Sequence, residues 1–190
     1  MPINNFADRR KLIAVALGQA PADLAIVNAR LLNVFTAEII PESGLTVSNG
    51  LIAGCGRIPS GSIGPQTRII DAAGDFLLPG YVESHTHIAN VFRLSDFSDA
   101  VLPHGTTTVI SETTELGNSL GYQGLCWLSK AAENLDLDLR FTAPCFSPPY
   151  PQFENSFPIS HEEYEKIFQD PRFVGVGEAY WPDIIAAGER

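Results

Sequence analysis

The chain has 190 residues, and hydrophobic side chains make up 45% of them, which is ample for a packed core and argues against a disordered protein. Twelve basic against 22 acidic residues give a formal net charge of -10, so nucleic acid and other anionic polymers are excluded as expected partners. The three cysteines are widely spaced, and the apolar residues 12–17 are too few to span a membrane, so we expect a cytoplasmic protein with no membrane segment.

The first segment, residues 1–22, is expected to form a helix over residues 6–20. Gly18 and Pro21 are typical of residues that end a helix. One side of this helix carries four apolar residues, and we expect that side to be buried. These four are Leu12, Ile13, Ala16 and Leu17.

The second segment, residues 23–78, consists of short β-type runs separated by loops rich in Gly, Pro and Ser. Asn49-Gly50 lies between two of these runs and is typical of a tight hairpin turn. The segment predicts a small β-sandwich or a single sheet. The expected strands are residues 24–27, 31–35, 45–47, 51–53 and 68–70.

The third segment, residues 79–190, alternates expected strands with expected helices, a pattern that indicates a parallel sheet. Its four strand-helix units predict an α/β fold, either an open sheet or the first half of a (β/α)₈ TIM-type barrel, which needs about 250 residues when complete. Ser160 and Glu163 are spaced as a helix capping box. The expected strands run through His85 and over residues 106–111, 139–145 and 173–178, and the helices over residues 95–101, 118–135 and 160–169.

Two histidines lie at the end of the first strand of this third segment. His85 and His87 are two positions apart, so their side chains share one face of a strand and can converge on one point. Neutral imidazole is the commonest metal ligand in proteins, so the pair predicts half of a metal site. The alternative is a polar patch on a solvated strand.

Several stretches of the chain carry a family resemblance. They include Arg9-Arg10-Lys11-Leu12-Ile13 near the start, Pro103-His104-Gly105-Thr106-Thr107 at the second strand of the third segment, and Val176-Gly177-Glu178 at its fourth. Together with the His-x-His pair after Pro79-Gly80, these stretches resemble the adenine deaminases of the amidohydrolase superfamily over nearly the whole chain.

The resemblance implies a β-sandwich joined to a metal-bearing barrel, in which His85 and His87 ligate a divalent metal and Glu178 bridges two metals. Manganese, iron and zinc all suit such mixed ligation. The implied substrate is a small purine, with adenine converted to hypoxanthine and ammonia by metal-activated water, and the implied assembly is a homo-oligomer. From the residues alone, Glu178 can equally be a carboxylate that meets solvent at a strand end.

Some residues near the expected site depart from the family pattern, and others have both a functional and a structural interpretation. Thr114 stands where the family has a histidine, and Ala89 replaces a glutamate, so another cyclic amidine or amide is an alternative substrate. Glu115 is kept and is expected in the substrate pocket, or else as a charge at a helix start. Cys145, at the end of the third strand, is expected to line the pocket or to be inert packing.

The resembled enzymes also use two more histidines and an aspartate that shuttles protons, and we expect this general base beyond Arg190. The 190 residues alone are therefore expected to be a catalytically incompetent portion of such an enzyme. A third hypothesis is a non-catalytic fragment that binds metal or another polypeptide.

Overall fold

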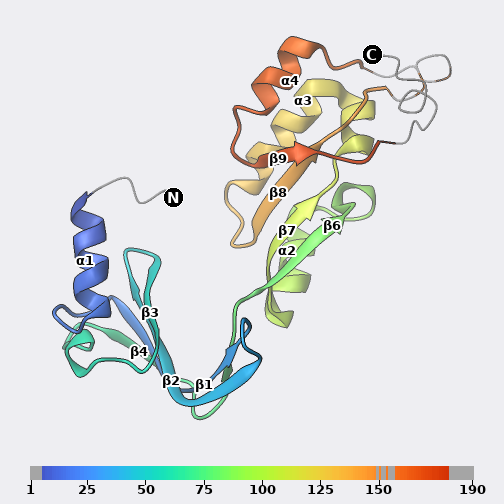
Figure 1. Cartoon of the computed structure of the whole chain (residues 1–190). Coiled ribbons are helices and arrows are strands. Elements are labelled where there is room, and N and C mark those ends of the chain that lie inside the picture. The colour runs from blue at the N-terminus through green and yellow to red at the C-terminus, as the bar shows by residue number, and fades with distance from the viewer. Residues whose placement is uncertain (1–5, 149, 151–152, 154–156, 180–190) are drawn as a thin grey trace. The chain divides into compact units, whose positions relative to one another are not determined.

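The computed structural model describes residues 6–148, 150, 153 and 157–179, and it shows a mixed α/β chain. The chain divides into two compact units, Met1–Pro79 and Gly80–Arg190, each of which is described by itself below (Figure 1). The first five residues of the expected helical segment, and residues 180–190 of the expected barrel segment, lie outside the described residues. No helix among the described residues is both long and apolar enough to cross a membrane.

The strands described in the first unit form one mixed sheet with the order β3-β2-β1-β4, and β5 also pairs with β1. β1 is antiparallel to β2 and parallel to β4 and β5. A single sheet, the second of the two alternatives, is therefore what these residues show. The strands are β1 (Leu24–Asn33), β2 (Glu38–Ser48), β3 (Leu51–Gly56), β4 (Arg68–Asp71) and β5 (Phe76–Leu77), and the 3-10 turn η1 is Ser60–Ser62.

The expected strand 24–27 and the first three residues of the expected strand 31–35 belong to the one strand β1, which ends at Asn33. The register of β1 against β2 shifts after Ile26 and again after Ala29. Asn28, between these points, has a φ of 56°. A local irregularity of this kind interrupts the apolar pattern without ending the strand, because the pairing resumes beyond it.

The predicted Asn49-Gly50 turn joins β2 to β3, with Ser48 paired to Leu51. Both turn residues have positive φ, 51° and 74°, as a two-residue hairpin of the primed type requires. The backbone N–H of Asn49 donates to Oδ2 of Asp23 over 2.6 Å. The turn is thus anchored to the start of β1.

The helix α1 (Phe6–Ala16) packs on β3 and β2, with only part of the side that the sequence predicted. Val15 is fully buried, whereas Ile13 and Leu17 are largely exposed. The hydroxyl of Ser62 donates to the carbonyl of Val15, which holds this face of the helix against η1. The prediction was wrong for Ile13 and Leu17, whereas Leu12 and Ala16 are half-buried. Apolar residues occupy every position from Leu12 to Leu17, so their spacing does not single out one side.

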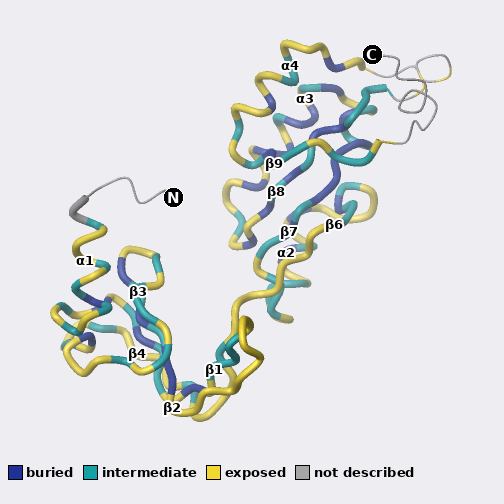
Figure 2. The backbone as a smooth tube through the Cα atoms, in the orientation of Figure 1, coloured by how far each residue is buried: buried dark blue, intermediate teal, exposed yellow. Residues whose placement is uncertain are grey.

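The second unit is a four-stranded parallel sheet with the order β6-β7-β8-β9. Figure 2 shows that burial is concentrated on β7 and β8, while β6 at the edge is mostly exposed. The strands are β6 (Tyr81–Thr86), β7 (Thr106–Ser111), β8 (Asp138–Ala143) and β9 (Phe173–Val176). The helices between them are α2 (Leu94–Val101), α3 (Thr114–Ala132, kinked at Gly121) and α4 (His161–Ile167), with 3-10 turns η2 (Ile88–Asn90) and η3 (Leu102–His104).

The core of this unit lies between the sheet and its helices. Alternate residues of β8, namely Leu139, Phe141 and Ala143, are buried, as expected for a strand with one face against helices. They pack with apolar residues of the helices such as Leu125 and Ile167. The capping box of α4 is confirmed, because the Ser160 side chain accepts from the Glu163 N–H and the Glu163 carboxylate accepts from the Ser160 N–H.

The largest boundary difference in this unit concerns α3, which begins at Thr114 rather than near residue 118. The helix therefore starts directly after the end of β7, and its first turn contains Glu115. Because all four strands are parallel, their carboxyl ends lie along one edge of the sheet. This edge, with the first turn of α3 beside it, positions the site described next.

Candidate metal centre

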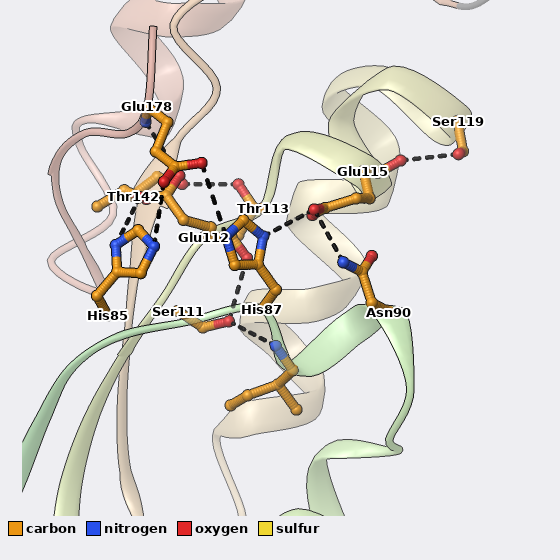
Figure 3. Close-up of polar contacts among 11 residues, drawn as sticks. His85, His87, Asn90, Ser111, Glu112, Thr113, Glu115, Ser119, Thr142 and Glu178 are labelled. Atoms are coloured by element: carbon orange, nitrogen blue, oxygen red, sulfur yellow. Dashed lines mark hydrogen bonds and ion pairs between the residues drawn. The ribbon is translucent and has the colours of Figure 1, made fainter. Parts of the chain in front are cut away.

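Three side chains converge at the carboxyl edge of the parallel sheet (Figure 3). His85 lies in β6, His87 follows the end of β6, and Glu178 lies two residues beyond the end of β9. His85 Nε2 is 3.2 Å from Glu178 Oε1, and His87 Nε2 is 3.7 Å from Glu178 Oε2. The three residues can each offer a ligand atom, with all three atoms within 4.8 Å of one another.

The group is accessible from solvent. The side chain of His85 is 51% exposed, that of Glu178 39% and that of His87 28%. The two imidazole rings are 5.3 Å apart between centroids and are inclined by 72°, so they do not stack face to face. A small ligand can therefore reach the nitrogen and oxygen atoms that converge here.

Beside this group lies Glu112, a buried carboxylate that the sequence reasoning did not single out. Its Oε2 accepts a hydrogen bond from the backbone N–H of Glu178 over 3.3 Å, and its Oε1 is 3.9 Å from His85 Nδ1. Its own N–H donates to the carbonyl of Thr86, which ties the end of β7 to the end of β6. Its position could have indicated this role, because Glu112 is an acidic residue directly after β7, at the edge that carries the histidines.

Gly177 makes room for that carboxylate. A Cβ atom at Gly177 would lie 2.0 Å from Oε2 of Glu112 and 2.8 Å from Oγ1 of Thr142, which are impossible separations. Glycine is therefore required for the close approach of β9 to Glu112. The same backbone contact places Glu178, the next residue, at the edge.

Glu115 contacts His87 directly. Its Oε1 lies 2.7 Å from His87 Nδ1 and also accepts a hydrogen bond from Asn90 Nδ2 over 3.0 Å (Figure 3). Burial acts to raise the pKa of the Glu115 carboxyl, but the hydrogen bonds from its own backbone N–H, Asn90 and His87 outweigh that effect and hold the pKa below its usual value. Glu115 is therefore ionised at neutral pH.

Thr114 and Cys145, the other two residues expected in a substrate pocket, are not among the three residues of the metal group. Thr114 is the buried first residue of α3, and its hydroxyl has no hydrogen-bond partner among the described residues. Cys145 lines a cavity beside α4, and burial raises the pKa of its thiol. The lining of that cavity includes none of the three residues of the metal group; it consists of Pro144, Cys145, His161, Tyr164, Glu165, Phe168 and Val176.

The donor set fits a divalent metal ion. Two neutral imidazoles and one carboxylate are the ligands that zinc, iron and manganese share, and all three are exposed enough to exchange with solvent. Two buried oxygen atoms beside the group, Oε2 of Glu115 and Oγ1 of Thr142, have no hydrogen-bond partner among the described residues. Buried polar atoms without partners are costly, so this edge favours a bound polar ligand or water.

No protein-family model matches the chain, but the chain is similar in sequence to curated adenine deaminases. It is 36% identical over 180 residues to the adenine deaminase of Moorella thermoacetica, covering 93% of this chain and 30% of that enzyme. It is 34% identical over 170 residues to adenine deaminase 3 of Rhizobium meliloti, covering 88% of this chain and 29% of that enzyme. With the adenine deaminase of Listeria innocua the identity is 31% over 187 residues, 98% of this chain and 31% of that enzyme.

Solved structures share the mixed α/β fold. A β-aspartyl dipeptidase from Fervidobacterium islandicum superimposes on 82% of this chain and 40% of its own, with a TM-score of 0.56 and 22% identity. An atrazine chlorohydrolase from Arthrobacter aurescens superimposes on 77% of this chain and 41% of its own, with a TM-score of 0.55 and 15% identity. At these identities the likeness shows the fold alone.

The chain spans about 30% of the length of the curated relatives that it matches. The predicted resemblance is therefore confirmed, and the chain matches an N-terminal portion of the adenine deaminase family.

Proposed function

We propose that the protein carrying this sequence is a metal-dependent adenine deaminase. In this reaction water adds its oxygen to C6 of adenine, the bond from C6 to the exocyclic nitrogen breaks, and ammonia leaves to give hypoxanthine. The observation that carries the proposal is the convergence of His85, His87 and Glu178 at one sheet edge, in a chain that is similar to adenine deaminases over nearly its whole length.

The proposal includes a (β/α)₈-type barrel whose first four strands are β6 to β9, together with a small β-domain over residues 23–78. Two features of the second unit support the barrel. The four strands are parallel and follow chain order, and the candidate site lies at their carboxyl ends, where active sites of such barrels are found.

In this proposal His85, His87 and Glu178 hold a divalent metal. Metal ions at such sites polarise the bond under attack and lower the pKa of water to near neutrality. A carboxylate has two oxygens, so Glu178 would hold this ion through one of them and could bridge to a second ion through the other in the complete enzyme. Manganese, iron and zinc all remain candidates, because this ligand set suits each of them.

The remaining residues of the edge have structural tasks in this scheme. Glu112 accepts a hydrogen bond from the backbone N–H of Glu178, and Gly177 allows the segment after β9 to approach Glu112 closely. Thr142, whose buried hydroxyl has no described partner, is well placed to bind a polar ligand because it adjoins Gly177. We assign the general base to none of the described residues.

A second candidate function is the hydrolysis of another cyclic amidine or amide. One observation favours it: the buried Thr114 hydroxyl, without a described partner, stands where the resembled family has a histidine. A hydroxyl and an imidazole differ in size and in the hydrogen bonds they offer, so the pocket of this protein can select a different ring. Assays on a panel of aminated purines and pyrimidines, next to adenine, separate the two candidates.

The proposal also places the enzyme in the cytoplasm as a homo-oligomer that acts on a free purine. Light scattering on the purified protein at several concentrations measures the assembly. A mass equal to that of one chain at all concentrations contradicts the oligomer.

The activity test uses the protein that carries this sequence, loaded in turn with manganese, iron and zinc. Adenine is added, and hypoxanthine and ammonia are measured. We expect equal amounts of both products from the wild-type protein, none from His87→Ala, and wild-type amounts from His104→Ala, which removes an exposed histidine of η3 that precedes β7. Turnover of another amine in place of adenine supports the second candidate, and metal binding with no turnover of any substrate supports the non-catalytic alternative.

A further inference from the structure

The two histidines of the metal group have different surroundings on the side that faces away from Glu178. His87 Nδ1 lies 2.7 Å from Oε1 of Glu115, within hydrogen-bonding distance. His85 Nδ1 lies 3.9 Å from Oε1 of Glu112, which is too far for a hydrogen bond. Among the described residues, His87 therefore has a carboxylate within hydrogen-bonding distance of its Nδ1, and His85 does not.

Asn90 holds the Glu115 carboxylate in place. It ends the 3-10 turn η2, which begins directly after His87, and its Nδ2 donates to the same Oε1 of Glu115 over 3.0 Å. The 3-10 turn places residues three apart on one side, so Asn90 and His87 reach Glu115 together (Figure 3). Glu115 in turn is fixed by its position in the first turn of α3.

This contact determines which nitrogen of His87 carries the proton. An ionised carboxylate only accepts hydrogen bonds, so the contact at 2.7 Å requires an N–H at Nδ1. In the neutral ring Nε2 then has its lone pair free, and Nε2 is the nitrogen that faces Glu178 at 3.7 Å. Metal-binding histidines commonly donate their second N–H to a carboxylate, which fixes the tautomer and the ring orientation.

We propose that Glu115, held by Asn90, is a positioning residue that fixes His87 as the Nδ1–H tautomer and aims Nε2 at the metal. This role adds to the substrate-pocket role expected from the sequence, because Oε1 is engaged by His87 and Asn90 while the buried Oε2 has no hydrogen-bond partner among the described residues. The inference rests on the proposed function for the presence of the metal. The tautomer itself belongs to the metal-free protein.

The first experiment measures the tautomer without metal. Long-range proton–nitrogen NMR spectra of protein with ¹⁵N-labelled histidine, recorded at an alkaline pH at which the nitrogen shifts themselves report a neutral ring, distinguish Nδ1–H from Nε2–H. We expect His87 as Nδ1–H in the wild type and in Glu115→Gln, whose amide oxygen still accepts. Glu115→Ala removes the acceptor, so we expect His87 to shift to a mixture of tautomers, while His85 in the same spectrum is unchanged.

The second experiment measures zinc affinity by competition with a chelator. Loss of a partner that orients a ligand costs about 10–100-fold in metal affinity, and we expect this loss for Glu115→Ala and a smaller one for Glu115→Gln. The matched control is Glu133→Gln, which removes an exposed acid just after the end of the same helix and should bind zinc as the wild type does. Should Glu115→Ala fail to fold, Glu115→Asp withdraws the carboxylate by one methylene with the charge kept, and the same tautomer change is expected.

These measurements separate the inference from the proposed function. Wild-type His87 found as Nε2–H, or a His87 tautomer that is the same in Glu115→Ala and wild type, overturns the positioning role whatever the metal does. Failure of the wild type to bind zinc, manganese or iron overturns the proposed metal site, and the tautomer result then still decides whether Glu115 orients His87.

Discussion

The two units of this chain each contain a sheet, but among the described residues the candidate site lies at the strand ends of the second. In the first unit β1, β2 and β3 run antiparallel, so successive strand ends lie at opposite edges. In the second unit all four strands run parallel, and residues far apart in sequence, such as His85 and Glu178, meet at one edge. Among the described residues, the group that could hold a metal belongs to the second unit.

The two sheets also differ in how far their apolar side chains are buried. Exposed apolar side chains such as Ile39, Ile69 and Phe76 remain on the first sheet, whereas the central strands β7 and β8 of the second are packed against helices (Figure 2). The comparison indicates that strand direction gathers the polar residues, and that the packed helices behind the sheet hold the strand ends in place. Perturbations of the site should therefore act on the second unit alone.

The largest expected effect follows removal of a metal ligand. Loss of an outer partner already costs about 10–100-fold in metal affinity, so His87→Ala and Glu178→Ala should each cost at least about 100-fold. Isothermal titration with zinc and manganese measures the affinity. His161→Ala, on the exposed face of α4, is the control and should bind as the wild type does; equal binding by all variants would show that the metal sits elsewhere.

Metal addition should next distinguish the two units. A ligand that binds only the folded state at about 100 times its dissociation constant adds about 2.7 kcal/mol of stability. Hydrogen exchange followed by mass spectrometry should show that metal addition slows exchange at the ends of β6 and β9. The exchange rates in β1 to β3 should not change. Equal slowing in both sheets would mean that the ion does not bind at the parallel sheet alone.

Gly177→Ala tests the close approach between β9 and Glu112. The new Cβ would collide with the Glu112 carboxylate, so that side chain must leave the N–H of Glu178. We expect metal affinity to fall about 10-fold, as for the loss of an orienting partner, with the fold retained. Gly175→Ala, two residues earlier in β9, is the control, because nothing lies within 4 Å of its added Cβ. An equal loss in both variants would assign the effect to the backbone of this segment instead.

Ser160→Ala removes the reciprocal capping box of α4. The expected cost is about 1 kcal/mol of unfolding free energy, as for other helix caps. Urea unfolding of the metal-free protein measures it. Metal affinity should stay at the wild-type value, because α4 carries no residue of the metal group; a changed affinity would mean that α4 orders the site.

The smallest expected effect is on the stability of the first unit at low pH. Hydrogen bonds from the Asn49 N–H and from Lys11, in that order, hold the pKa of Asp23 below its usual 3.8. A carboxyl with a lowered folded pKa stabilises the fold fully above its unfolded pKa, and this contribution is lost as pH falls through the folded value. Urea unfolding at about pH 7 and pH 3 should show a smaller acid-induced loss for Asp23→Asn than for the wild type, by less than about 1 kcal/mol because Asp23 is half exposed.

Much of the second unit followed from the sequence, because its signals are local. β7 has the predicted bounds, Thr106–Ser111, and the Ser160 capping box was predicted from the spacing of two residues. The convergence of His85 and His87 was predicted from their spacing along a strand. The approach of Glu178 to both histidines was predicted from the parallel strands and the family resemblance. These inferences required only spacing, strand direction and resemblance.

What the sequence did not predict depends on contacts between distant residues. Nothing in the neighbourhood of Glu112 indicates that a glycine 65 positions later would make room for its side chain. The hydrogen bond from Asn90 to Glu115 depends on where α3 begins, and the sequence placed that start four residues late. The buried side of α1 was missed for a similar reason, since Ser62 and the sheet select Val15 from an evenly apolar stretch.

The most direct test of the central claim is the X-ray absorption spectrum of the zinc-loaded protein at the metal edge. The account predicts two imidazole ligands at about 2.0–2.1 Å with carboxylate oxygen completing the shell, and one imidazole in His85→Ala. A shell of oxygen atoms alone, or an imidazole count that His85→Ala and His87→Ala leave unchanged, would contradict it.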